Sequence, residues 1–89
     1  MNVTISKMGD SKYRVSVEDG GSETEHEVTV TAADVARYAP GTTPEKLLGA
    51  SFEFLLERES NDSILRRFDL PVIERYFPEY AREIGKRVR

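Results

Sequence analysis

Few residues in this chain of 89 could carry out chemistry, and His26 is the foremost of them. It is the single histidine, so a serine–histidine pair or an imidazole-based metal site would have to use it. Counting in steps of two along its extended run places His26 on the face of Val28 and Val30, while its acidic neighbours point the other way. A half-buried strand residue beside a turn explains this pattern without catalysis. We therefore predict no catalytic or metal-binding role for His26.

Carboxylates and glycine-rich turns offer little more. Asp62 and Asp69 stand where helices are expected to begin, and N-capping accounts for both. Gly20-Gly21 lies between two strand-like runs and lacks the spacing and the lysine of a phosphate-binding loop. The chain has no cysteine, which excludes disulfides, thiol catalysis and cysteine-based zinc sites. The sequence thus predicts a protein that is not an enzyme, with no catalytic residue, metal or cofactor.

Basic side chains gather near the end of the chain, where spacings of seven, four and three residues suit one face of a helix. Two further arginines precede the corner Asp69-Leu70-Pro71, and the whole loosely resembles a helix-turn-helix. The formal net charge of −3 opposes non-specific binding to polyanions. A nucleic-acid-associated or antitoxin-like regulator therefore stays open as the alternative function. Its contact residues would be Arg66, Arg67, Arg75, Arg82 and Lys86, with Arg89 continuing the same face.

Three aromatic residues crowd into five positions around Pro78. Phe77 lies about 100° round a helix from Tyr76, so one narrow stripe cannot bury all three rings. Either a bend at Pro78 brings them all into the core, which we favour, or one stays exposed to anchor a partner. The leading prediction is a non-catalytic binding or regulatory module that associates with another protein or its own copy. Its partner-binding residues would be Arg75, Tyr76, Tyr80 and Arg82.

The elements that must position these residues begin with an extended half. Apolar and polar residues alternate over three runs, at about 2–8, 12–18 and 23–31. Turn signals separate the runs, so three strands joined by short turns form an antiparallel meander. One face of this meander is apolar and needs a cover.

The remainder of the chain is predicted to be helical and supplies that cover. Capping signals at Thr31 and at Thr43-Pro44 open the first two helices. Pro78 lacks the N–H that would bond the carbonyl four residues earlier, so we expect a kink or two abutting helices there. The predicted helices span about 32–39, 44–58, 63–68 and 70–87.

Composition and patterning together predict one α+β domain over residues 1–89. The chain is 38% apolar and 33% charged, which is too apolar for a disordered chain. Its apolar runs are too short to span a membrane, and its first residues lack a signal-peptide core, which predicts a cytoplasmic protein. So small a core should leave no cavity for a reaction. The predicted core is Val3, Ile5, Tyr13, Val15, Val17, Val28, Val30, Leu48, Phe52, Leu55, Ile64, Phe68, Ile73 and Phe77.

One segment also resembles a known group of proteins. The motifs SFxFLLERE at 51–59, SILxxFDL at 63–70 and IxRYFPEY at 73–80 are similar to the signature of a family of small uncharacterised bacterial proteins. That family has proline where this chain has Ser60. The resemblance implies a bacterial, cytosolic protein with an N-terminal β-hairpin region, and it transfers no site residue.

Overall fold

The computed structural model describes residues 1–88 and has an α+β fold built on a four-stranded mixed sheet. The strands follow the order β1-β2-β3-β4, and the first three form the predicted antiparallel meander. The fourth strand runs parallel to β3, and the sequence did not predict this pairing. The strand bounds are β1 Asn2–Lys7, β2 Lys12–Asp19, β3 Ser22–Thr29 and β4 Arg67–Asp69.

The predicted helix over 63–68 is therefore wrong. A short 3-10 turn, η1 (Asn61–Ser63), leads into extended chain and then into β4. The amide N–H of Glu27 donates to the Arg66 carbonyl at 2.7 Å, and that of Leu70 donates to Thr29 at 3.0 Å. These bonds replace helical ones, and a short apolar run does not distinguish a helix from a buried strand.

Four helices complete the fold. Both predicted N-terminal caps are confirmed: Thr31 forms a capping box with Asp34, and the Thr43 hydroxyl accepts from the Lys46 amide. Of the two outcomes expected at Pro78, a kink or two abutting helices, the structure shows the second, because the predicted helix over 70–87 is divided into two helices. Phe77 leaves helical geometry at φ −132° and ψ 86°, as expected of a residue that precedes proline. The helix bounds are α1 Ala32–Tyr38, α2 Pro44–Leu56, α3 Val72–Tyr76 and α4 Tyr80–Arg87.

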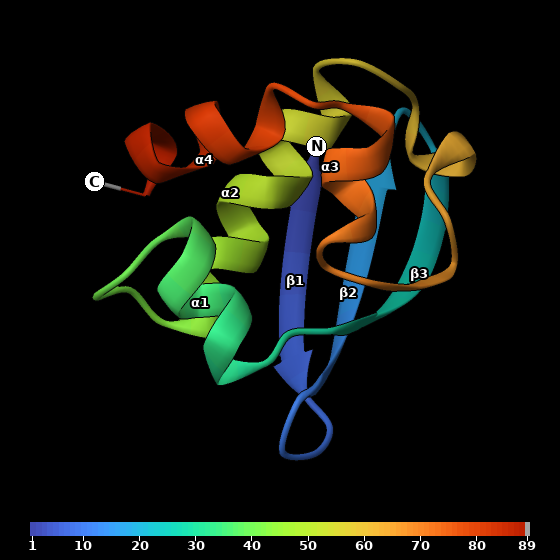
Figure 1. Cartoon of the computed structure of the whole chain (residues 1–89). Coiled ribbons are helices and arrows are strands. Elements are labelled where there is room, and N and C mark those ends of the chain that lie inside the picture. The colour runs from blue at the N-terminus through green and yellow to red at the C-terminus, as the bar shows by residue number, and fades with distance from the viewer. Residues whose placement is uncertain (89) are drawn as a thin grey trace.

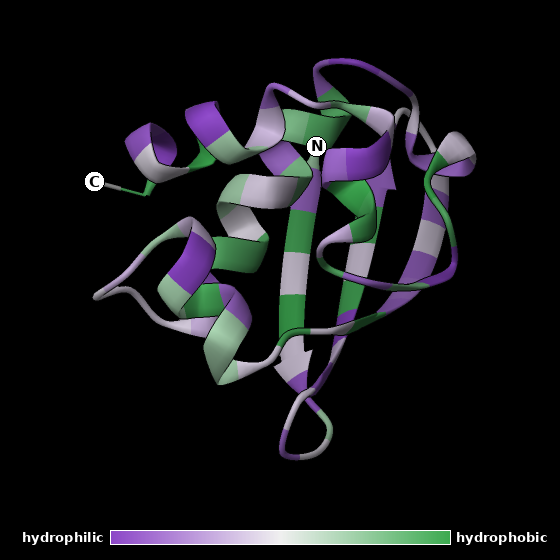
Figure 2. Ribbon diagram, in the orientation of Figure 1, coloured by the Kyte–Doolittle hydropathy of each residue, from purple (hydrophilic) through white to green (hydrophobic). Residues whose placement is uncertain are grey.

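The helices cover one face of the sheet, with α2 and α3 lying across it (Figure 1). Hydrophobic and hydrophilic residues alternate along β1 (Figure 2), as a strand with one covered face requires. Eleven of the predicted core residues are buried, while Val3, Ile5 and Phe77 are only partly buried. Large buried residues outside the predicted set are Tyr38, Leu47, Phe54, Leu70, Tyr80 and Ile84.

Arg58 ties the end of α2 to the α3–α4 junction. Its guanidinium lies 3.6 Å from the centre of the Phe54 ring and forms ion pairs with Glu79 at 3.3 Å and Glu83 at 3.5 Å. Among residues 1–88, no helix has the length and apolar character needed to cross a membrane.

Candidate functional site

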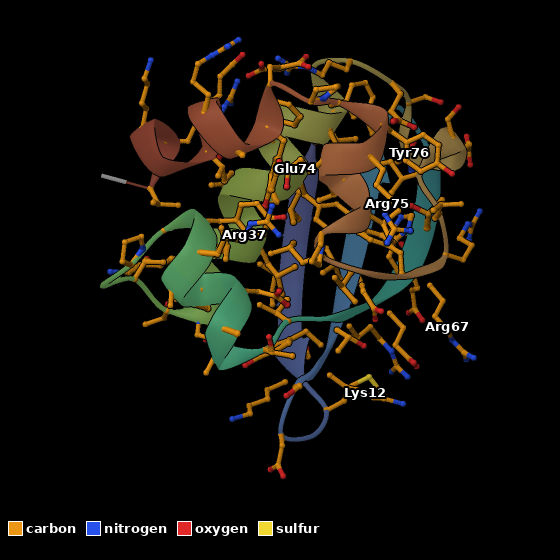
Figure 3. All side chains as sticks on the ribbon, in the orientation of Figure 1. Lys12, Arg37, Arg67, Glu74, Arg75 and Tyr76 are labelled. Carbon is orange, nitrogen blue, oxygen red and sulfur yellow. The ribbon has the colours of Figure 1, made fainter. Side chains whose placement is uncertain are left out.

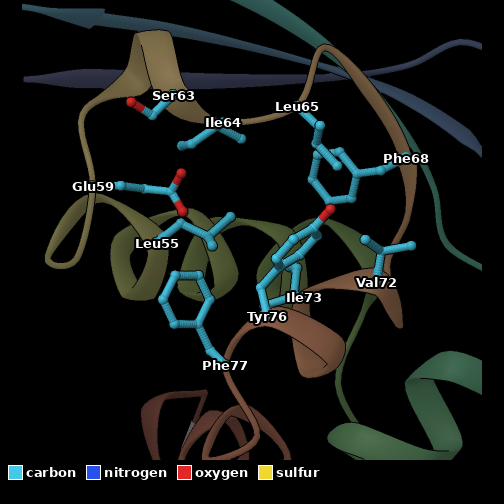
Figure 4. A pocket seen from close by; sticks show the side chains of 10 residues that line it. All are labelled: Leu55, Glu59, Ser63, Ile64, Leu65, Phe68, Val72, Ile73, Tyr76 and Phe77. Atoms are coloured by element: carbon cyan, nitrogen blue, oxygen red, sulfur yellow. The ribbon is translucent and has the colours of Figure 1, made fainter.

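An apolar groove of about 380 Å³ opens between α3, the end of α2 and the chain from η1 to β4 (Figure 4). The prediction of a core without a cavity for a reaction did not include this surface groove. Nearly all of the lining side chains are aliphatic or aromatic. The groove is lined by Leu55, Glu59, Ser63, Ile64, Leu65, Phe68, Val72, Ile73, Tyr76 and Phe77.

Two of the lining residues expose large apolar side chains. Leu65 is 45% and Tyr76 66% exposed, and they come from segments that face each other across the groove. Leu65 points outward because its extended segment alternates, so that the neighbouring Ile64 faces the core. Tyr76 ends α3 just before the break. An exposed apolar pair beside an apolar hollow is typical of a docking site.

Among the described residues, Glu59 is the one acidic residue that lines the groove. Its carboxylate points into the hollow between Leu55 and Ile64 (Figure 4). Burial raises the pKa of this carboxyl. Within residues 1–88 the carboxylate makes no hydrogen bond or ion pair. A cationic group of a ligand bound in the groove would form an ion pair with this half-buried carboxylate and stabilise its charge.

His26 fastens the segment that carries Leu65. Its Nδ1 lies 2.7 Å from the Leu65 carbonyl, which can only accept, so Nδ1 carries the proton and donates. The Thr24 hydroxyl then donates to Nε2 at 2.8 Å, and the Asn61 amide donates to Thr24 at 3.2 Å. His26 is 1% exposed, so the predicted half-buried position is wrong although the predicted face is right. The histidine acts as a structural bridge between β3 and one wall of the groove.

The buried imidazole makes stability dependent on pH. Burial lowers the pKa of His26 from its usual value of 6.5, the Leu65 bond opposes this, and Arg66 adds to it. Below about pH 6.5 the unfolded chain therefore binds more protons than the folded chain. As the pH drops through this range, the free energy of unfolding should fall with a slope of up to about 1.4 kcal/mol per pH unit. Above that pH the contribution is fully present. Urea unfolding at a series of pH values measures the slope.

A His26→Leu variant is the matched control for this slope. It should lose the component that begins near pH 6.5 and keep the decline at lower pH to which the carboxyls of Glu57 and Glu79 contribute, because their pKa values are lowered. An unchanged slope in this variant would show that His26 does not titrate on unfolding.

The predicted partner-binding residues are divided by the fold. Arg75 and Tyr76 are exposed and adjacent on α3 (Figure 3), and Arg82 is exposed on α4. Tyr80, by contrast, is fully buried, with its hydroxyl 2.7 Å from that of Ser51. Tyr80 is therefore a core residue in this structure and offers no surface to a partner. The favoured burial of all three aromatics is also wrong, because Tyr76 stays outside.

The predicted nucleic-acid contacts do not form one surface. Arg67 lies far across the molecule from α4, which carries Arg82 and Lys86 (Figures 1 and 3). Arg67 also pairs with Glu27 at 3.4 Å. The helix-turn-helix resemblance is wrong because β4 occupies the place of its first helix. Arg66 and Arg75 are both exposed. Arg89 lies outside the described residues.

Asp62 and Asp69 do not cap helices, contrary to the sequence prediction. Asp62 accepts a hydrogen bond from the Ser22 hydroxyl at 3.1 Å, and Asp69 lies within β4. Over residues 1–88, no group of three or more histidine, aspartate and glutamate side chains is placed to hold a metal ion. Sequence reasoning missed Glu59 and Leu65 because the helical prediction for 63–68 hid the groove that they line.

Comparison of the chain with protein-family models, curated protein sequences and solved structures finds no match. The family resemblance of residues 51–80 accordingly stays a prediction.

Proposed function

We propose that this protein is a non-catalytic binding module whose groove beside α3 receives a segment of a partner protein. The main support for this proposal is that Leu65 and Tyr76 stay exposed on either side of a groove of about 380 Å³ with mainly apolar walls. Aromatic and aliphatic side chains that border such a hollow supply most of the energy in protein interfaces. The partner segment accordingly carries an apolar anchor.

The negative charge of Glu59 further limits the kind of partner segment that we expect to bind. Glu59 brings into the apolar wall a carboxylate that has no ion pair among residues 1–88, and burial already opposes its ionised form. A lysine or arginine that binds there would gain a charge-assisted hydrogen bond shielded from water. Arg75 is exposed next to Tyr76 on α3 and is available to an acidic group of the same segment. The proposed ligand is an apolar segment with a basic residue one or two side chains away.

A random peptide display library selected on the full chain tests this proposal. We expect the selected peptides to combine an aromatic or aliphatic residue with a nearby lysine or arginine. Tyr76→Ala should weaken binding of such a peptide roughly 30-fold, the loss expected of a hot-spot residue. Glu59→Gln should weaken binding of basic peptides and leave that of their neutral analogues unchanged. Titration calorimetry measures each dissociation constant.

Met8→Ala is the matched control, because Met8 is 48% exposed but lies outside the groove. Peptides that bind equally well to Tyr76→Ala, or a selection with no enriched sequence, would contradict the proposal. Salt-sensitive retention on heparin that Arg66→Gln and Arg67→Gln abolish would instead support the nucleic-acid alternative.

A further inference from the structure

We propose that two copies of this chain associate through β1, pairing antiparallel across a two-fold axis into one continuous sheet. The groove beside α3 takes no part in this contact, so the two surfaces are independent.

The hairpin register determines which groups of β1 are unpaired. The Met8 amide donates to the Lys12 carbonyl at 2.8 Å, which makes these two residues a hydrogen-bonded pair. Hydrogen-bonded pairs alternate along an antiparallel ladder, so the even-numbered residues of β1 bond β2. The N–H and C=O groups of Val3, Ile5 and Lys7 therefore point away from the sheet. Three donors and three acceptors in a row form a template for another strand.

The two edges of the sheet differ in the features that prevent such pairing. β4 has three residues, two of them charged, and Pro71 follows soon after. Short, charged edges next to proline resist the addition of a strand. β1 has six residues, no proline and a single charge, at Lys7. Met1 and Met8 stand at its two ends and are 65% and 48% exposed.

A second copy of β1 matches this edge in one register. With Ile5 on the two-fold axis, Val3 pairs with the partner's Lys7, and all six outward groups of each strand are satisfied from within β1. A centre at Thr4 would set Lys7 opposite a residue outside β1, and a centre at Ser6 would do the same to Val3. The Ile5 register also covers Val3 and Ile5, which the helices leave only partly buried.

Sedimentation equilibrium on the full chain tests the association. Lys7→Pro removes an outward N–H but no bond to β2, and the Lys7 side chain is exposed, so the fold is retained. The substitution deletes two hydrogen bonds per dimer and should raise the dissociation constant at least roughly tenfold. Lys7→Gln keeps the N–H and is the matched control, with a dissociation constant close to that of the wild type. A monomer at all accessible concentrations would overturn the proposal, as would a dimer that Lys7→Pro leaves unchanged.

Cysteine cross-linking tests the register, and the chain has no cysteine to interfere. Centring on Ile5 places Thr4 opposite the partner's Ser6 in a non-hydrogen-bonded pair, where side chains lie closest. A mixture of Thr4→Cys and Ser6→Cys chains should form a disulfide-linked dimer under mild oxidation, while neither variant alone should. Self-linking of Thr4→Cys would reveal the shifted register and contradict the proposal, as would a mixture that fails to cross-link.

Discussion

Replacing Tyr80 by alanine should lower the free energy of unfolding by about 3–5 kcal/mol, the cost typical of deleting a large buried aromatic side chain. The ring is fully buried and packs edge-on against Phe54 at 5.4 Å and Tyr38 at 5.1 Å. Its hydroxyl also bonds the buried Ser51 of α2. Because these contacts join α4 to α1 and α2, their loss removes the attachment of the last helix. Urea unfolding followed by circular dichroism measures the change.

Tyr76→Ala is the matched control, since the same substitution four residues earlier removes a side chain that is 66% exposed. Its effect on stability should stay within about 0.5 kcal/mol, as is usual for surface sites. Tyr80→Phe keeps the ring and should cost about 0.5–1.5 kcal/mol, because Ser51 can still donate to the Leu47 carbonyl. Equal effects of alanine at positions 76 and 80 would contradict the burial of Tyr80 on which this prediction depends.

Replacing His26 by leucine should cost about 2–4 kcal/mol at neutral pH, since it leaves buried polar groups without their partners. Leucine has a similar size but cannot donate to the Leu65 carbonyl or accept from the Thr24 hydroxyl. The segment from η1 to β4 should then open more readily. Amide hydrogen exchange should therefore quicken most near Leu65, in one wall of the groove, and less in the β1–β2 hairpin.

A double-mutant cycle with Thr24→Val separates the hydrogen bonds from the loss of ring packing, because His26 also lies 5.4 Å from the Phe52 ring. In the wild type, Thr24→Val leaves Nε2 of the imidazole and the Asn61 amide short of a partner. In the His26→Leu background it should cost less, by about 0.5–3 kcal/mol of coupling. Strict additivity of the two substitutions would show that the Thr24–His26 bond contributes nothing to stability.

Local patterns in the sequence were sufficient for the parts of the fold that depend on neighbouring residues. Alternation at period two defines β1 to β3, and the caps at Thr31 and Thr43 define where α1 and α2 begin. Their success has one physical cause. Each feature depends on side-chain directions and hydrogen bonds between residues that are close in the chain, so distant segments do not change it.

The 63–70 segment shows where local patterns fail. Its apolar residues fit a helical turn and a buried strand equally well, and only the bonds from β3 decide for the strand. Leu65 becomes exposed as a consequence, and Glu59 faces a groove instead of solvent. The side chains of the candidate site were thus fixed by a pairing with residues about forty positions earlier in the chain.

The sequence by itself determined a small α+β domain with one covered sheet face, because hydrophobic periodicity and capping act over short distances. The tertiary structure alone decided that Tyr80 is buried, that Tyr76 is exposed and that His26 bridges two segments. Pro78 predicted a break between the aromatics but not the direction of the helix that follows it. That direction depends on how α4 packs against α1 and α2, and side-chain burial at this site follows from that packing.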